Sequence, residues 1–206
     1  MESSAGFWDK IADKYSKQPI ADEASYQRKL EMTQSYLKQD MEVVELGCGT
    51  GSTAIIHAPY VKHIRAIDIS PRMIEIAQSK ASSIGIQNIT FETSTIEELK
   101  IDQESVDVVL ALSILHLVEN RDSVVDIIYE MLNPGGIFVS STICLNDDMK
   151  WLKLIAPLGK SIGLMPMVKF FTKSDLESGI KNQGFEIEHS WKPGKRKATF
   201  IVSRKP

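Results

Sequence analysis

The sequence predicts an α/β fold built on a seven-stranded mixed sheet, with five parallel core strands, a C-terminal hairpin and helices on both faces. Short β-branched runs alternate with amphipathic helical stretches. The runs are apolar on both faces, as in a parallel sheet that helices cover on both sides. A glycine-rich segment follows the first run, at the sheet edge where open α/β folds bind ligands.

The core strands are expected where β-branched residues gather in runs of strand length. These runs are Val43–Leu46, His63–Asp68, Asn88–Glu92, Val106–Leu112 and Gly136–Thr142. A helix is predicted over Pro71–Ser83, because Ser70 is a favourable N-cap and Pro71 suits the first helical position. A second helix is predicted over Asp122–Leu132, ended by a turn at residues 133–136.

The flanking segments complete the predicted fold. Helices are expected over residues 7–16 and 22–39, with Pro19 between them. After the fifth strand, residues 147–171 form an apolar, lysine-bearing stretch interrupted by prolines and glycines. A helix over Thr172–Asn182 and two strands, Phe185–Trp191 and Ala198–Arg204, finish the chain.

Composition excludes several classes of protein. Of the 206 residues, 43% are hydrophobic and 25% charged, a balance typical of a globular domain rather than a disordered chain. No apolar run approaches the roughly 20 residues of a membrane-spanning helix, and no signal peptide is expected. Cys48 and Cys144 lie far apart without a C-x-x-C spacing, which favours thiols in a reducing, cytoplasmic location.

Charge is unevenly distributed. The net charge of -3 combines a balance of -11 over residues 1–148 with +8 over residues 149–206. Residues 149–173 hold five lysines and no acidic residue, interleaved with large apolar side chains. This stretch is interpreted as a helix covering the sheet, as a substrate lid, or as a surface that contacts anionic lipid. Nucleic-acid binding is not expected, because no stacking platform or arginine-rich stretch accompanies the charge.

The strongest functional signal is the segment Glu45-Leu46-Gly47-Cys48-Gly49-Thr50-Gly51 after the first strand. Its glycines allow a sharp turn and a close approach by a ligand. The second strand ends in Asp68, whose carboxylate can accept the hydroxyl groups of a ribose. The dinucleotide fingerprint would place its third glycine at Ser52, and no second nucleotide-binding half follows. A nucleoside without a pyrophosphate is therefore the expected ligand.

With these motifs the chain resembles the class I S-adenosylmethionine-dependent methyltransferases, closest to the ubiquinone- and menaquinone-biosynthesis-like small-molecule branch. The resemblance extends over nearly the whole chain. Beyond the glycine segment, it rests on matches at Trp8–Tyr15, Ala66–Ser70 with Met73, Phe91–Thr95, Val106–Val109, Leu115–Leu117 and Leu132–Gly136. It implies a Rossmann-like fold and S-adenosylmethionine as cofactor, with S-adenosylhomocysteine as product.

The resemblance also implies roles for individual residues. The methionine end of the cofactor would lie against Glu45 and the backbone of Gly47, Cys48 and Gly49. Its ribose would bind Asp68, and its adenine would lie between Ile69 and Met73. The family commonly has Gly-Asp-Ala where this chain reads Ser94-Thr95-Ile96, so Thr95 and Ile96 replace the usual contact to the adenine amino group. The sulfonium would lie beside Leu112 and Ser113, with Tyr15 closing over the cofactor.

Methyl transfer from a sulfonium depends mainly on alignment and water exclusion, so a dedicated base is optional. His116, after the fourth strand, is the candidate base, with a structural role as the alternative. No metal is expected, because the histidines and cysteines lack ligand spacing. Cys48 is interpreted as a small packing residue rather than a nucleophile.

The resemblance predicts one methyltransferase domain over residues 1–206. It divides into an N-terminal helical cap (1–40), a cofactor-binding core (41–145), a substrate lid (146–172) and a final helix with a hairpin (173–206). The predicted function is methyl transfer to a small, partly apolar acceptor that is anionic or lipophilic. The alternative is a non-catalytic protein that binds S-adenosylmethionine or a partner with the same fold. Peripheral contact with a membrane surface is compatible with either.

Overall fold

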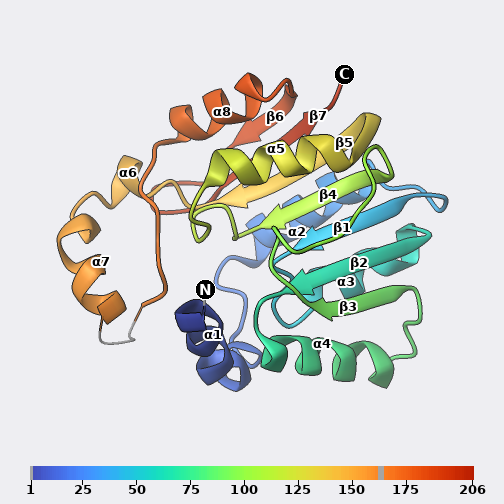
Figure 1. The fold of residues 1–206 in the computed structure, drawn as a ribbon, viewed down its shortest axis with the longest axis horizontal. Helices are drawn as coiled ribbons and strands as arrows, with labels where there is room; N and C mark the ends of the chain where they lie inside the picture. Colours follow the sequence, from blue (N-terminus) through green and yellow to red (C-terminus); the bar gives the residue numbers. More distant parts are fainter. Residues whose placement is uncertain (1, 162–164) are drawn as a thin grey trace. The chain divides into compact units, whose positions relative to one another are not determined.

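A computed structural model describes residues 2–161 and 165–206. Seven strands form one mixed sheet in the order β3-β2-β1-β4-β5-β7-β6 (Figure 1). They are β1 (Glu42–Leu46), β2 (His63–Asp68), β3 (Ile89–Thr93), β4 (Val106–Leu112), β5 (Leu132–Thr142), β6 (Glu186–Trp191) and β7 (Thr199–Arg204). The predicted fold class is confirmed: β1 pairs in parallel with β2 and β2 with β3, while β7 runs antiparallel to both β5 and β6.

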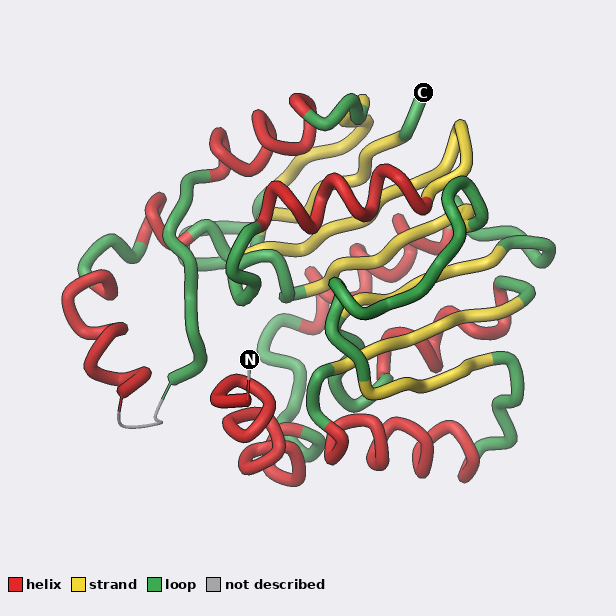
Figure 2. The backbone as a smooth tube through the Cα atoms, viewed as in Figure 1, coloured by secondary structure: helices red, strands yellow, loops and turns green. Residues whose placement is uncertain are grey.

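Helices follow β1, β2 and β4, as the hydrophobic pattern predicted, whereas β3 leads to β4 through a loop (Figure 2). The helices are α1 (Glu2–Tyr15), α2 (Glu23–Gln34), α3 (Ser52–His57), the 3-10 turn η1 (Ala58–Tyr60), α4 (Pro71–Ser83), α5 (Arg121–Met131), α6 (Leu145–Asp148), α7 (Leu152–Ser161) and α8 (Lys173–Asn182). The chain folds as two compact units. Unit 1 comprises the chain up to Lys100 together with Val106–Val108. Unit 2 comprises Ile101–Ser105 and Val109–Pro206.

Unit 1 is built on the parallel strands β1, β2 and β3. Its core holds fully buried side chains from β1 and β2, including Leu46, Ile64 and Ile67. Helix α4 packs along β2 and β3 and buries Met73 and Ala77. Ser70 caps this helix as predicted, because its hydroxyl accepts a hydrogen bond from the backbone N–H of Met73 at 3.1 Å.

Unit 2 is built on the antiparallel strands β5, β7 and β6, with α5 and α8 packed against each other. The Phe185 ring makes an edge contact with Tyr129 and a tilted contact with Phe138. Lys205, 6% exposed, lies at the end of α5. Its ammonium donates to the carbonyls of Leu132 at 2.8 Å and Tyr129 at 3.0 Å, so a cation neutralises the negative end of the helix.

The structure corrects three predicted boundaries. Helix α1 begins at Glu2 rather than residue 7. Helix α2 spans Glu23–Gln34 rather than 22–39; Asp22 caps its start by accepting a hydrogen bond from the N–H of Ser25, and the helix ends at the C-cap Ser35. The expected turn at 133–136 is instead the beginning of β5. Paired hydrogen bonds join that segment to the backbone of Lys205, from Gly135 N at 2.8 Å and to Gly136 O at 2.9 Å.

Within residues 2–161 and 165–206, no helix is long and apolar enough to cross a membrane. The subdivision into a cap, a core, a lid and a final hairpin stays a prediction. Residues 162–164 of the expected lid lie outside the described residues.

Candidate cofactor and acceptor sites

The glycine segment between β1 and α3 adopts the conformation that only glycine accepts without strain. Gly47, Gly49 and Gly51 have φ values of 68°, 54° and 72°. The N–H of Cys48 donates to the carbonyl of Ile67 at 2.8 Å, which fixes the loop against the end of β2. The loop therefore turns sharply at the carboxyl ends of β1 and β2, where open α/β sheets bind ligands.

The second and third glycines of the loop serve different purposes. A Cβ at Gly51 would lie 2.7 Å from the Ala77 Cβ and 2.9 Å from the Phe91 ring, so this glycine allows the loop to pack on α4 and β3. A Cβ at Gly49 would have a single described neighbour within 4 Å, Cε1 of Tyr15 at 3.9 Å. Gly49 thus faces space that a ligand can enter, with Tyr15 beside it.

Asp68 at the end of β2 is held by the backbone. Its Oδ2 accepts from the N–H of Gly49 at 2.9 Å and its Oδ1 from the N–H of Ser70 at 2.9 Å. Burial raises the pKa of Asp68, and these two hydrogen bonds act in the opposite direction. Each carboxylate oxygen has a second lone pair, so Asp68 can still accept hydroxyl protons from a ligand.

Glu45 is a buried carboxyl group beside the same loop. The residue is 3% exposed, and its Oε2 has no hydrogen-bond partner among the described residues. Burial raises the pKa of Glu45 to about 8, and the nearby charge of Asp68 acts in the same direction, although the N–H of Ala54 donates to the carboxyl group and opposes the shift. A buried carboxyl oxygen without a donor is a position where a ligand ammonium group would be stabilised.

Side chains expected around the adenine also lie in unit 1. Met73 and Ile96 are buried, and Ile69 is half-buried. The Thr95 hydroxyl donates to Oε2 of Glu98 at 3.0 Å and accepts from the Glu98 N–H at 3.2 Å. One lone pair of the Thr95 oxygen therefore remains for a ligand donor, with the Glu98 carboxylate next to it.

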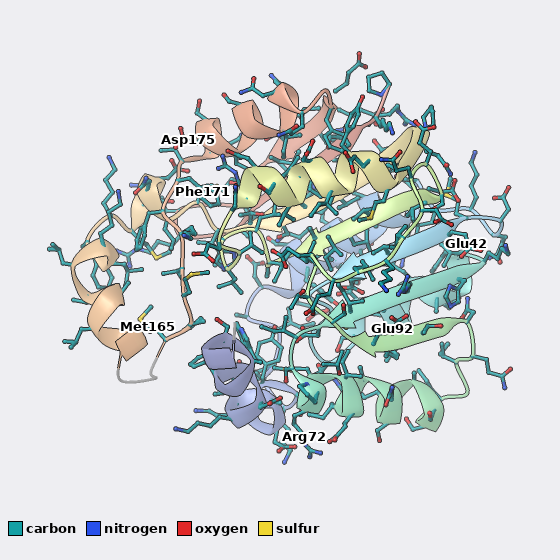
Figure 3. All side chains as sticks on the ribbon, viewed as in Figure 1. Glu42, Arg72, Glu92, Met165, Phe171 and Asp175 are labelled. Carbon is teal, nitrogen blue, oxygen red and sulfur yellow. The ribbon has the colours of Figure 1, made fainter. Side chains whose placement is uncertain are left out.

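Helix α1 is attached to the start of α4 by charged groups that the sequence pattern did not single out. The Asp9 carboxylate accepts from the Ser70 hydroxyl at 2.5 Å and from the N–H of Arg72 at 3.1 Å. The Arg72 guanidinium pairs with Asp13 at 2.8 Å, and Arg72 lies at the start of α4, next to α1 (Figure 3). These contacts place Tyr15, at the end of α1, beside Gly49.

Lys80 is another residue that sequence reasoning missed. Its ammonium donates to the hydroxyls of Thr50 at 2.9 Å and Ser52 at 3.4 Å, and so holds the glycine loop from α4. Desolvation lowers the pKa of Lys80. No local pattern in the sequence indicates this contact, because it joins residues 30 and 28 positions apart.

Leu112, Ser113 and His116 lie in unit 2, so their predicted place beside the cofactor stays a prediction. Ser113 has a φ of 65°, and its N–H donates to the carbonyl of Ser141 at 2.7 Å. A non-glycine residue in this region is strained, and such strain is frequent at functional sites.

His116 is buried at 8% exposure, and its Nδ1 has no hydrogen-bond partner among the described residues. Burial lowers the pKa of His116 to about 4, so the ring is neutral near pH 7. The carbonyl of His116 accepts from the N–H of Lys169 at 2.8 Å. This hydrogen bond brings the segment 165–170, with its half-buried Met165, Met167 and Phe170, alongside the loop that carries His116.

The basic terminal turn of unit 2 is partly neutralised. The Lys192 ammonium lies 2.5 Å from Oδ2 of Asp148 and 3.8 Å from Oδ2 of Asp147. The N–H of Arg196 donates to the same Asp148 oxygen at 2.9 Å. The turn is therefore fixed to α6, after β5, and Lys192 contributes less free positive charge than the sequence alone suggests.

Cys48 and Cys144 are both buried free thiols. Burial raises the pKa of the Cys48 thiol, which does not fit a nucleophile. No group of three or more metal-ligating side chains is found in the described part of the chain. Independence from metal stays a prediction.

Comparisons with known proteins give a consistent result. A family model described as "Methyltransferase domain" matches residues 37–188. A ubiquinone biosynthesis O-methyltransferase from Azorhizobium caulinodans is 30% identical over 153 residues, or 71% of this chain and 59% of that protein. The protein of the same name from Rickettsia canadensis is 35% identical over 155 residues, or 72% of this chain and 64% of that protein. The chain thus spans less than two thirds of these relatives.

Solved structures show the same fold. An S-adenosylmethionine dependent methyltransferase from Mesorhizobium loti has a TM-score of 0.73 at 20% identity, over 89% of this chain and 99% of that one. The [4+2]-cyclase SpnF also has a TM-score of 0.73, at 16% identity, over 87% and 80% of the two chains. Identities this low establish the architecture alone, and the fold carries more than one chemistry.

Proposed function

The chain belongs to the class I S-adenosylmethionine-dependent methyltransferases, and we propose that it transfers the cofactor's methyl group to a small acceptor with an apolar body. The observation that carries the proposal is the arrangement around the glycine loop in unit 1. It combines an accessible glycine at position 49, a carboxylate at Asp68 held by two backbone donors, and a buried carboxyl oxygen at Glu45 without a partner.

These groups match the polar groups of S-adenosylmethionine. Glu45 would bind the ammonium group, the backbone at Gly47, Cys48 and Gly49 would border the methionine portion, and Asp68 would accept the ribose hydroxyls. Ile69, Met73, Thr95 and Ile96 would surround the adenine. When bound, the cofactor supplies an activated methyl group, so the protein needs to orient the acceptor and exclude water.

The acceptor is proposed to bind in unit 2. The half-buried Met165, Met167 and Phe170 offer an apolar wall. They belong to the segment 165–170, in which the N–H of Lys169 bonds the His116 carbonyl. The neutral His116 ring, with Nδ1 unpartnered in the described structure, can accept a hydrogen bond from an acceptor O–H or N–H and orient that atom. Leu112 and Ser113 are proposed, as the sequence predicts, to lie beside the sulfonium of the cofactor.

An acidic group on the acceptor would favour the basic stretch 149–173. Lipophilic acceptors that carry a hydroxyl or carboxyl group are therefore the first class to test. The buried thiols of Cys48 and Cys144 suit a cytoplasmic location, which we include in the proposal.

The deciding experiment measures the formation of S-adenosylhomocysteine with a panel of lipophilic phenols, carboxylic acids and their neutral analogues. The proposal requires turnover with at least one acceptor. His116→Ala is expected to lower kcat and leave cofactor affinity unchanged, whereas His63→Ala, a matched variant on β2, is expected to change neither. Cofactor binding without turnover across the panel would favour the non-catalytic alternative. Unchanged turnover in a folded His116→Ala protein would make His116 structural.

A further inference from the structure

Helix α7, together with Trp151 directly before it, exposes a row of large apolar side chains. Leu154 is 86% exposed, Leu158 65%, Trp151 55% and Ile155 47%. Because they are spaced by three and four residues, these positions share one face of the helix. Within unit 2, α7 stands away from the strands and precedes the segment that leads to α8 (Figures 1 and 2). We call Trp151, Leu154, Ile155 and Leu158 the α7 apolar face.

The opposite side of α7 makes the contacts with its own unit. Ala156 is buried and Leu152 is half-buried. The Lys153 ammonium lies 5.7 Å from the centroid of the Phe170 ring. The helix thus turns its small and half-buried residues inward and its largest apolar residues outward. This is the reverse of the usual arrangement for a surface helix, and such a patch marks an interaction surface.

The charge around the α7 apolar face identifies its partner. Lys150, two residues before α7, and Lys153, in its first turn, are exposed, and no acidic residue occurs between positions 149 and 173. Apolar side chains flanked by lysines, with a tryptophan at one end, are typical of helices that lie in the interface of an anionic bilayer. We propose that the α7 apolar face docks this protein on an anionic membrane surface.

Two other occupants fit less well. A second copy of the chain would bring the same lysines together, and four side chains fall short of the 20–30 residues per partner in a typical stable interface. A membrane-spanning role is excluded for α7, because its 10 residues are about half of what a bilayer requires. The α7 apolar face therefore suits binding in the headgroup region. The proposal does not depend on the identity of the methyl acceptor.

The test is sedimentation of the full chain with vesicles of phosphatidylcholine alone and of phosphatidylcholine with phosphatidylglycerol. Wild type is expected to bind the anionic vesicles and to dissociate as salt is added. Leu154→Ser with Leu158→Ser should reduce the partition coefficient by at least roughly tenfold. Lys150→Gln with Lys153→Gln should reduce it by roughly 10- to 30-fold.

Matched controls distinguish vesicle binding through the α7 apolar face from nonspecific adsorption of the protein. Ile84→Ser removes an apolar side chain that is 62% exposed in unit 1, and Lys38→Gln removes an exposed lysine there. Neither change should alter vesicle binding. Trp151 reports insertion directly: tryptophan emission should shift to the blue with anionic vesicles, and Trp151→Phe should abolish that shift. All variants must keep the wild-type melting temperature and affinity for S-adenosylhomocysteine.

Three outcomes would overturn the proposal. Equal binding to neutral and anionic vesicles would remove the role of charge. Dimers that Leu154→Ser with Leu158→Ser dissociates, without vesicle binding, would identify a second copy as the occupant. An absence of vesicle binding by the wild type, together with a raised KM for the acceptor in Leu154→Ser with Leu158→Ser, would make α7 part of the acceptor site. Loss of turnover alone, with vesicle binding intact, would contradict the proposed function and leave this proposal standing.

Discussion

Replacing Glu45 with glutamine tests the cofactor site and the electrostatics of the fold together. The pKa of Glu45 is raised from 4.5 to about 8 by burial, so the folded protein holds this proton more tightly than the unfolded chain. The stability that the protonated form provides is complete below about pH 4.5. It is lost as the pH rises towards 8, at about 1.4 kcal/mol per pH unit.

From about pH 6 to pH 8, Glu45 alone should therefore lower the free energy of unfolding of the cofactor-free protein by about 2 kcal/mol. For a chain of this length, that corresponds to a fall in melting temperature of roughly 4–8 °C. Glu45→Gln cannot ionise and should lack this fall, so the variant becomes increasingly more stable than wild type as the pH rises. Thermal unfolding across this pH range measures the effect.

The cofactor should reverse the ranking of the two proteins. Its ammonium group stabilises the ionised carboxylate, so binding to wild type should release a proton and strengthen as the pH rises towards 8. Glu45→Gln should bind S-adenosylhomocysteine roughly 10- to 150-fold more weakly, equivalent to about 1.5–3 kcal/mol for a hydrogen bond to a charged group. Titration calorimetry in buffers of different ionisation heat measures both the affinity and the proton release.

Glu97→Gln is the matched control, because Glu97 is an exposed carboxylate in the same unit. It should change neither the pH profile nor the affinity. The reasoning fails if Glu45→Gln and wild type lose stability in parallel above pH 6, or if they bind the cofactor equally well.

Three further changes probe other parts of the structure. Asp68→Ala should weaken S-adenosylhomocysteine binding by about 1–3 kcal/mol in a calorimetric titration, because the ribose loses a charged acceptor; Asp102→Ala, at an exposed site, should have no effect, and equal affinities would exclude Asp68 from the ribose site. Gly51→Ala should lower the free energy of unfolding in urea by about 2–4 kcal/mol, since its Cβ would clash with Ala77 at a φ of 72°; Gly194→Ala, whose Cβ would meet no atom of a described, non-adjacent residue within 4 Å, should cost far less. His57 is 1% exposed and burial lowers its pKa from 6.5 to about 4, so stability is complete above about pH 6.5 and is lost as the pH falls towards 4; His57→Leu should reduce this loss in acid unfolding curves, and curves parallel to wild type would refute the assignment.

Most helices and strands could be predicted from the sequence because the local sequence preferences agree with the tertiary packing. The runs at 63–68 and 106–112 became β2 and β4 without change, and Pro71–Ser83 became α4, because Ser70 and Pro71 define its start. The predicted start of β5 was wrong because the contacts that determine it are distant in sequence. The backbone of Lys205 pairs with Gly135 and Gly136. Turn propensity at 133–136 reflects local preference alone.

The residues of the candidate site likewise fall into those that the sequence predicted and those that it did not. Glu45, the glycine loop and Asp68 are contiguous with strand ends, so their meeting follows from the topology of a parallel sheet. Asp9 and Lys80 reach the site from α1 and α4, across 61 and 30 positions. Such pairings depend on how helices pack, and hydrophobic periodicity does not encode them.

The burial of Lys205 gives this protein an internal reporter of its native state. Among the lysines whose burial the structure describes, Lys205 is the one that is buried, and its ammonium is enclosed by two carbonyls and Glu104. Amine-reactive reagents require a free, accessible amine. Acylation of Lys205 should therefore occur only after the end of α5 has opened locally. The labelling rate at Lys205, compared with an exposed lysine such as Lys38, would follow local opening without any engineered probe.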